Sequence, residues 1–181
     1  MGYHGITDRT ARRLTDSVHY TEAQQRLPQG ARRHLPVPVP IPQLRVKNVS
    51  GAARAAFDIL GLGAAVYNPS TQADQFQAGA VLAGELPHTA DHLGRFAVLQ
   101  QAAATNEIAA AVASGVCLCK VYCQTSADEQ LEYADVDDGT VSHLKAVESG
   151  AAQILWRASG TGTQWAVVRI GGGGGSGMAI R

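Results

Sequence analysis

From Leu44 onward, apolar residues occur in short runs that are separated by glycine, asparagine, aspartate and proline. Runs of this length, with turn residues between them, are typical of β-strands rather than of long helices. Strands at such spacing are characteristic of sandwiches and closed barrels. We therefore expect an all-β fold, with a compact β-barrel or β-sandwich body of one domain over residues 43–170. The expected strands cover residues 44–48, 56–60, 64–67, 77–85, 95–100, 107–113, 116–123, 130–134, 152–158 and 163–170.

The alanine-rich run at residues 107–113 fits two interpretations. Its composition favours a helix, because alanine has the highest helix propensity. Its short length and the Ser114-Gly115 pair that follows leave room instead for a strand that forms a hairpin with residues 116–123. We place this run among the strands.

Residues 152–170 predict the hairpin around which the body is organised. Two apolar runs flank a Ser-Gly-Thr-Gly sequence, which is the pattern of a tight β-turn that begins on a glycine. A two-residue loop would place Trp156 opposite Trp165, and Ile154 opposite Val167. One face of the hairpin would then carry an aromatic pair above an aliphatic pair.

A three-residue loop would instead place Arg157 opposite Trp165. With either loop, Trp156 and Trp165 are the only tryptophans of the chain and its largest apolar side chains. We therefore assign both rings to the structural core, where the other residues are mostly alanine and valine.

Two segments outside the body differ from it in composition. Residues 1–42 form a basic, proline-rich N-terminal arm, in which proline alternates with apolar residues over the last eight positions. This alternation predicts an extended polyproline-like strap, because proline fixes φ and lacks an N–H donor. The strap is either a stiff spacer or a segment that lies in a groove of a neighbouring subunit. Residues 171–181 form a glycine-rich C-terminal tail.

The arm and its strap supply the candidate partner-binding residues of the sequence. These residues are Arg12, Arg13, Arg32, Arg33, Val37, Val39 and Ile41. Arginines in such an arm can contact nucleic-acid phosphates, but an acidic protein surface is the more common partner. We therefore expect a protein partner and no nucleic acid.

The composition is that of an ordinary globular protein, with 45% hydrophobic residues and a formal net charge of zero. A neutral chain does not bind nucleic acid by its bulk charge. The N-terminus has no apolar stretch of signal-peptide length, and no segment approaches the roughly 18 apolar residues of a membrane span. We expect a soluble protein that is made in the cytoplasm and has no membrane partner.

Cys117, Cys119 and Cys123 fall within seven residues of the predicted strand 116–123. Alternate residues of a strand share one face, so these three side chains point the same way. We therefore assign them to the structural core. A zinc site would need a fourth ligand, such as His143, and wider ligand spacing. A disulfide or an inter-subunit thiol contact is the remaining alternative, although the odd count and cytoplasmic synthesis argue against it.

Two further motifs resemble ligand sites but are better explained as turns. His88 and His92 have a spacing that binds zinc on a long helix, yet the glutamate and the helix of such sites are missing. The segment 133–139 contains Asp135 and Asp137 but departs from the calcium-loop pattern in its glycine position and lacks the closing glutamate. No nucleophile elbow or phosphate-binding loop occurs in the sequence. We expect a non-enzymatic protein with no catalytic residues, no metal and no cofactor.

Several short motifs carry a resemblance to a known group of proteins. They are Asn48-Val49-Ser50-Gly51, Gly94-Arg95-Phe96-Ala97-Val98, Ser114-Gly115-Val116-Cys117, Gly150-Ala151-Ala152-Gln153-Ile154-Leu155-Trp156, Gly160-Thr161-Gly162-Thr163 and Trp165-Ala166-Val167-Val168-Arg169. Through them, residues 45–171 resemble a family of small proteins associated with tailed-phage structural genes. The chain is also similar in layout to compact β-barrel proteins that decorate or cement phage capsids.

The resemblance implies a structural component of the virion. The expected role is a capsid decoration or cement protein that bridges major capsid proteins and stabilises the head, with a homotrimer as its own assembly. Weak contacts of this kind gain strength through multivalency. A tail, neck or fibre-base protein is the alternative within the particle. A carbohydrate-binding or host-binding module is an alternative of another class, in which Trp156 or Trp165 would be exposed rather than buried.

Overall fold

The computed structural model describes residues 43–171, so residues 1–42 and 172–181 of the predicted arm and tail lie outside the described residues. The described residues are mostly strands, which confirms the expected all-β fold. The strands are β1 (Leu44–Asn48), β2 (Ile59–Ala65), β3 (Val81–Glu85), β4 (Phe96–Leu99), β5 (Ile108–Val112), β6 (Gly115–Cys123), β7 (Tyr133–Asp135), β8 (Leu144–Val147), β9 (Ala152–Arg157) and β10 (Gly162–Ile170). Short helices are α2 (Ala73–Ala78), α3 (Thr89–His92) and the 3-10 turn η2 (Ala127–Gln130).

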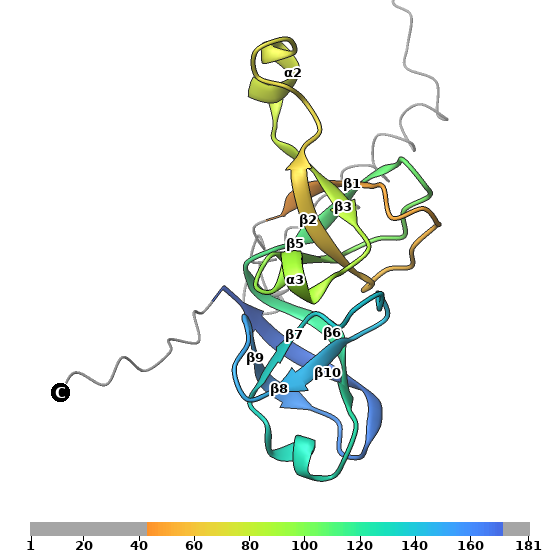
Figure 1. Ribbon diagram of the computed structural model, residues 1–181, viewed down its shortest axis with the longest axis vertical. Coiled ribbons are helices and arrows are strands. Elements are labelled where there is room, and N and C mark those ends of the chain that lie inside the picture. Colours follow the sequence, from red (N-terminus) through yellow and green to blue (C-terminus); the bar gives the residue numbers. More distant parts are fainter. Residues whose placement is uncertain (1–42, 172–181) are drawn as a thin grey trace, which may run out of the picture. The chain divides into compact units, whose positions relative to one another are not determined.

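The strands form two closed barrels rather than the one barrel or sandwich that we expected (Figure 1). In the first barrel the neighbouring strands follow the order β1, β3, β2, β4 and β5. In the second barrel the order is β6, β8, β7, β9 and β10. A closed barrel has no free sheet edge, so each five-stranded unit satisfies its own backbone hydrogen bonds.

The two barrels share one topology. In each, the first strand in chain order pairs in parallel with the third and antiparallel with the fifth. In each, the second strand lies between the third and the fourth, and the fourth pairs with the fifth, all antiparallel. The described chain is therefore a tandem repeat of one barrel pattern, which makes strand pair β4–β5 the structural counterpart of β9–β10.

Small and branched side chains fill both barrels. Val46, Leu60, Leu99 and Ala111 belong to the buried cluster of the first barrel. Alternate strand residues face inward, so Cys119 and Val168 lie inside the second barrel, where their cross-strand partners are Ala166 and Cys117. A five-stranded barrel is narrow, so alanine, valine and cysteine fit its interior better than rings do.

Most of the expected strands are present, with four differences, one of which is that the expected strand 130–134 is observed as β7 and begins only at Tyr133. The expected strands 56–60 and 64–67 merge into β2, and the expected strand 77–85 begins only at Val81 because α2 precedes it. Strand β8 was not expected. Figure 1 shows α2 on a connection that projects from β2 and β3, and none of its six residues is buried.

The run 107–113 is a strand, β5, rather than a helix, as we expected. Its alanines alternate between the two faces, and Ala109 and Ala111 are buried inside the first barrel. The predicted hairpin with residues 116–123 is wrong, because β5 pairs with β1 and β4 while β6 pairs with strands of the second barrel.

The hairpin at residues 152–170 is confirmed, but both of its predicted registers are wrong. Trp156 lies opposite Val167, and Arg157 lies opposite Ala166. The loop between β9 and β10 is longer than two or three residues, and the backbone N–H of Ala158 donates to the carbonyl of Trp165 at 3.0 Å. The two tryptophans are therefore not cross-strand partners.

Candidate binding surface

Six apolar side chains lie on the outer side of three neighbouring strands, and we name this surface the aromatic face. It consists of Val116, Leu118, Leu155, Trp156, Trp165 and Val167. Val167 is at its centre, because its cross-strand partners are Leu118 on β6 and Trp156 on β9. Neighbouring strands are about 4.8 Å apart, so this row of three side chains spans roughly 10 Å. The residues form one continuous apolar patch.

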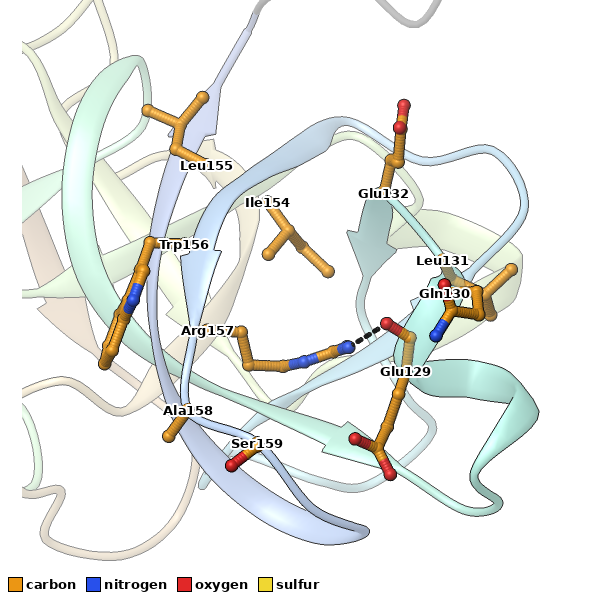
Figure 2. A pocket seen from close by; sticks show the side chains of 10 residues that line it. All are labelled: Glu129, Gln130, Leu131, Glu132, Ile154, Leu155, Trp156, Arg157, Ala158 and Ser159. Carbon is orange, nitrogen blue, oxygen red and sulfur yellow. Dashed lines mark hydrogen bonds between the residues drawn. The ribbon is translucent and has the colours of Figure 1, made fainter.

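A β-bulge adds Leu155 to the aromatic face. Val167 pairs with Trp156 and the next residue, Val168, pairs with Ile154, so Leu155 is an extra residue on β9. A bulge interrupts the alternation of a strand and can direct two successive side chains to the same side. Figure 2 shows Leu155 and Trp156 on one side of β9, while Ile154 and Arg157 point to the other. The bulge therefore enlarges the aromatic face at its β9 edge.

Trp165 is held in place by two neighbours. The ring of Phe57 meets it edge-on at a centroid distance of 5.5 Å, and Lys120 Nζ lies 5.2 Å from the centroid of the Trp165 ring. Both geometries are favourable for an aromatic ring. Phe57 has a φ of 70°. This left-handed conformation costs a non-glycine residue about 1–2 kcal/mol, and the packing of the Phe57 ring on Trp165 helps to offset that cost.

The charged residues on the three strands of the aromatic face are cations. Lys120 lies beside Trp165, and Arg169 donates to the Oε1 atom of Gln153 at the other end of the strands. No aspartate or glutamate occurs in the sequences of β6, β9 and β10. An apolar centre with a polar and charged rim is the usual organisation of a protein interface.

The tryptophan rings are not in the core, so our assignment of Trp156 and Trp165 to it is wrong. Trp156 is 58% exposed and Trp165 is 46% exposed. The sequence contains a signal that would have placed them correctly. Trp165 and Arg169 have the same parity along β10, whereas Ala166 and Val168 have the other parity. An arginine and a large ring on one side, with small residues on the opposite side, indicate that the rings face outward from a narrow barrel.

Behind β9 lies an open pocket of about 370 Å³, which β9 forms with η2 and the residues after it. Figure 2 shows Arg157 crossing this pocket towards Glu129. The guanidinium donates to the backbone carbonyl oxygens of Asp128 and Glu129, and its Nη1 lies 2.9 Å from the Sγ atom of Cys123. These bonds attach η2 to β9, so Arg157 serves the fold of the second barrel.

The assignment of Cys117 and Cys119 to the core is confirmed, and Cys123 is buried with them. Burial raises the pKa of the Cys117 thiol from its ordinary 9.0 to about 11. Burial, and then the neighbouring Cys117, raise the pKa of Cys119 further. The pKa of Cys123 is also raised by burial, and Arg157 partly opposes this shift. All three groups are therefore neutral thiols at neutral pH.

We expect the three thiols to be unreactive in the folded protein. At pH 8, iodoacetamide should modify none of them within minutes, whereas in 6 M guanidinium chloride it should modify all three, as intact-mass spectrometry will show. Because the folded pKa values are raised, the neutral thiols stabilise the fold below pH 9, and this contribution is lost as the pH rises through their folded values. Rapid modification of Cys117 or Cys119 in the native protein would contradict this account.

The two motifs that resemble ligand sites have structural roles. His88 and His92 lie on the turn of α3, where the backbone N–H of His88 donates to Nδ1 of a buried His92 at 3.0 Å. Gly61 makes room for the imidazole, since a Cβ atom there would lie 2.4 Å from the ring. Within residues 43–171, no group of three or more His, Cys, Asp or Glu side chains is arranged to hold a metal ion.

We expected Asp135 to lie in a turn, but it is the last residue of β7 and its carboxylate is buried. Its Oδ1 atom accepts hydrogen bonds from the backbone N–H groups of Gly94 and Val136, and its Oδ2 atom accepts one from Ala151. A carboxylate that accepts several backbone bonds is well compensated for its burial. Asp135 therefore joins the loop before β4 to β7 and to the start of β9.

Asn48 is the third buried polar residue of the described chain, after His92 and Asp135, and no sequence pattern marked it. Its Nδ2 donates to the carbonyls of Ala52, Ala103 and Ala104 at 2.8, 3.1 and 3.2 Å. Its Oδ1 accepts from the backbone and the hydroxyl of Ser50. One side chain thus closes two loops at one end of the first barrel. Two of the three carbonyl partners of Asn48 lie 55 and 56 residues away in the sequence. The local sequence around Asn48 therefore does not reveal its role.

The candidate arm residues lie outside the described residues and stay predictions. Arg12, Arg13, Arg32, Arg33, Val37, Val39 and Ile41 all belong to this group. Among residues 43–171, no helix is long and apolar enough to cross a membrane. Comparisons with protein-family models, curated proteins and solved structures gave no match for this chain.

Proposed function

We propose that this chain is a non-catalytic structural protein of a larger assembly, in which it packs against a neighbouring protein subunit through the aromatic face. The observation that carries the proposal is a continuous patch of six apolar side chains, including both tryptophans, on the outside of a closed barrel. Single exposed apolar residues are ordinary on protein surfaces, whereas contiguous patches mark interaction sites.

The composition of the aromatic face supports a protein partner. Tryptophan is the residue most enriched at the energetic centres of interfaces, and aliphatic neighbours exclude water around it. Trp156 is surrounded by Leu155 and Val167, which offer no hydrogen bonds to a polar ligand. Phe57 and Lys120 hold Trp165 in one orientation, so little conformational freedom is lost when a partner binds.

The assembly that we propose is the head of a tailed phage, where this protein binds the major capsid protein as a decoration or cement protein. This setting follows from the resemblance of the sequence motifs, and a tail, neck or fibre-base position is its alternative. Repeated over a shell, one contact of moderate strength per copy gives a large total stabilisation. The basic arm of residues 1–42 would add a second contact to each copy.

Leu118→Ser tests the proposal, because it removes an exposed apolar side chain of the aromatic face without opening a core cavity. We expect this variant to be lost from purified particles by at least tenfold relative to the wild-type protein, as quantitative mass spectrometry of gradient-purified particles will show. Leu93→Ser is the matched control, since Leu93 is 58% exposed on the first barrel and Leu118 is 49% exposed. The control should enter particles normally. Wild-type levels of Leu118→Ser in particles, or absence of the wild-type chain from them, would refute the proposal.

A carbohydrate-binding module is the second candidate function, and the 58% exposure of Trp156 is the observation that favours it. An exposed indole can stack on a sugar ring. Both tryptophans of the chain lie on the aromatic face, so tryptophan fluorescence, excited selectively over the five tyrosines, reports on that surface. This second function predicts a saturable emission change with soluble oligosaccharides that is abolished by Trp156→Ala. The protein-docking function predicts no change with any oligosaccharide tested.

A further inference from the structure

The repeated topology allows the surroundings of equivalent surfaces in the two barrels to be compared. Strands β4 and β5 of the first barrel occupy the same topological positions as β9 and β10 of the second. In both pairs the outward side is apolar. It carries Phe96, Val98 and Val112 in the first barrel. In the second barrel it carries the four residues of the aromatic face that lie on β9 and β10, and Leu118 of β6 continues this surface as the cross-strand partner of Val167.

In the first barrel this outward side is covered. Phe96, Val98 and Val112 are each at most 2% exposed, although they point away from the interior residues Ala97, Leu99 and Ala111 of the same strands. They belong to the same buried cluster as the interior side chains of the second barrel. The outer surface of this strand pair is therefore a place where another barrel of the same topology packs.

In the second barrel the equivalent surface is exposed except where Phe57 meets Trp165, and the chain contains no further strand after β10 among its described residues. We infer that the aromatic face binds a second copy of this chain, whose barrels cover it as the second barrel covers the outer side of β4 and β5. This inference rests on the proposed function and specifies it: the neighbouring subunit on the aromatic face is a second copy, and contact with the major capsid protein is left to the rest of the chain.

The charges determine how the second copy is oriented. The aromatic face carries Lys120 and Arg169, whereas the rest of residues 43–171 holds twelve carboxylates against six lysines and arginines. Two aromatic faces placed together would juxtapose cations, which opposes association. The complementary contact joins the aromatic face of one copy to the remaining surface of the next, where carboxylates outnumber lysines and arginines. Such a head-to-tail contact is heterologous and gives a closed ring, such as a trimer, when the rotation per copy closes.

Sedimentation velocity of the full chain over 1–200 µM tests this inference. We expect concentration-dependent association that weakens as salt is raised from 50 to 500 mM, because the contact joins opposite charges. Leu118→Ser and Arg169→Glu should each weaken association about tenfold or more. Leu93→Ser and Arg45→Glu are the controls, since both side chains are exposed on the first barrel, and they should associate as the wild type does. Far-UV circular dichroism and urea midpoints of all variants establish that they are folded.

Three outcomes would overturn the inference. The first is a monomer at every concentration. This result would leave open that the aromatic face binds a different protein in particles, which the particle experiment with Leu118→Ser tests separately. The second is association that Leu118→Ser and Arg169→Glu leave unchanged. The third is a monomer whose tryptophan emission shifts to longer wavelength in the full-length variant Val37→Ser/Val39→Ser/Ile41→Ser. In that case the strap of the same chain, rather than a second copy, covers the aromatic face.

Discussion

Asn48→Asp should destabilise the protein by about 3–5 kcal/mol, a large part of the total stability of an ordinary domain. Asn48 is fully buried, and its amide group donates to three carbonyl oxygens. An aspartate would bring a negative charge against the same three oxygens and would have no hydrogen to donate. The buried charge would be neither solvated nor paired, so the free energy of unfolding should fall by this amount in urea denaturation.

Asn68→Asp is the matched control for Asn48→Asp. The Oδ1 atom of Asn68 accepts a hydrogen bond from the backbone of Ser70 in an exposed loop, and a carboxylate oxygen can accept the same bond. We expect a change within about 0.5 kcal/mol. The deficit of Asn48→Asp should also become smaller as the pH falls towards 4, because a protonated carboxyl group carries no charge and regains one donor. Equal effects of the two substitutions would contradict the role assigned to Asn48.

Asp135→Ala should cost about 3–5 kcal/mol of stability, because it leaves three backbone N–H groups, whose bonds to Asp135 are buried or partly buried, without their acceptor. The N–H groups belong to Gly94, Val136 and Ala151, so the loss affects the ends of three different strands. Asp135→Asn should cost less, about 1–3 kcal/mol, since an amide keeps one oxygen acceptor and turns an NH2 group towards a donor. Chemical denaturation followed by tryptophan fluorescence will measure both values.

Asp137→Asn separates this effect from a general sensitivity of the segment. Asp137 lies two residues away, and its carboxylate is 3.9 Å from Lys145 Nζ in a partly exposed ion pair. Ion pairs of this kind contribute at most about 1 kcal/mol. If Asp137→Asn destabilised the protein as much as Asp135→Asn does, the three hydrogen bonds of Asp135 would not explain the difference.

The sequence was sufficient to predict the strands, because their signal is local. Short apolar runs between turn residues identified β1, β4, β5, β6, β9 and β10 with bounds close to those observed. The alternation of Cys117, Cys119 and Cys123 also predicted a buried face correctly. Strand β8 has only four residues, and α2 interrupts an apolar run, so the local pattern at both places was weak.

The division into two barrels could not be predicted from the same pattern. Evenly spaced apolar runs predict strands but not which strands pair. In each barrel the first strand pairs with the third and the fifth, and no local pattern indicates these pairings. The repeat became visible only when the pairings were compared. Asn48 and Asp135 were missed for a related reason, since their hydrogen-bond partners lie up to 56 residues away in the sequence.

The candidate binding surface depended on two features that sequence patterns represent poorly. The size of Trp156 and Trp165 suggested a core position, but the interior of a five-stranded barrel is narrow and is filled by smaller side chains. The bulge at Leu155 then placed two successive side chains on one side of β9, which strict alternation does not allow. Arg169 on the tryptophan side of β10 was the local evidence that pointed outward.

The central claim is that another protein covers the aromatic face in the assembled state. Hydroxyl-radical footprinting with mass spectrometry measures this directly, because Trp156 and Trp165 are the only tryptophans of the chain. We predict that oxidation of Trp156 falls several-fold in purified particles relative to the isolated chain at low concentration, while oxidation of Leu93 on the first barrel stays constant. Equal oxidation of Trp156 in both samples would contradict the claim.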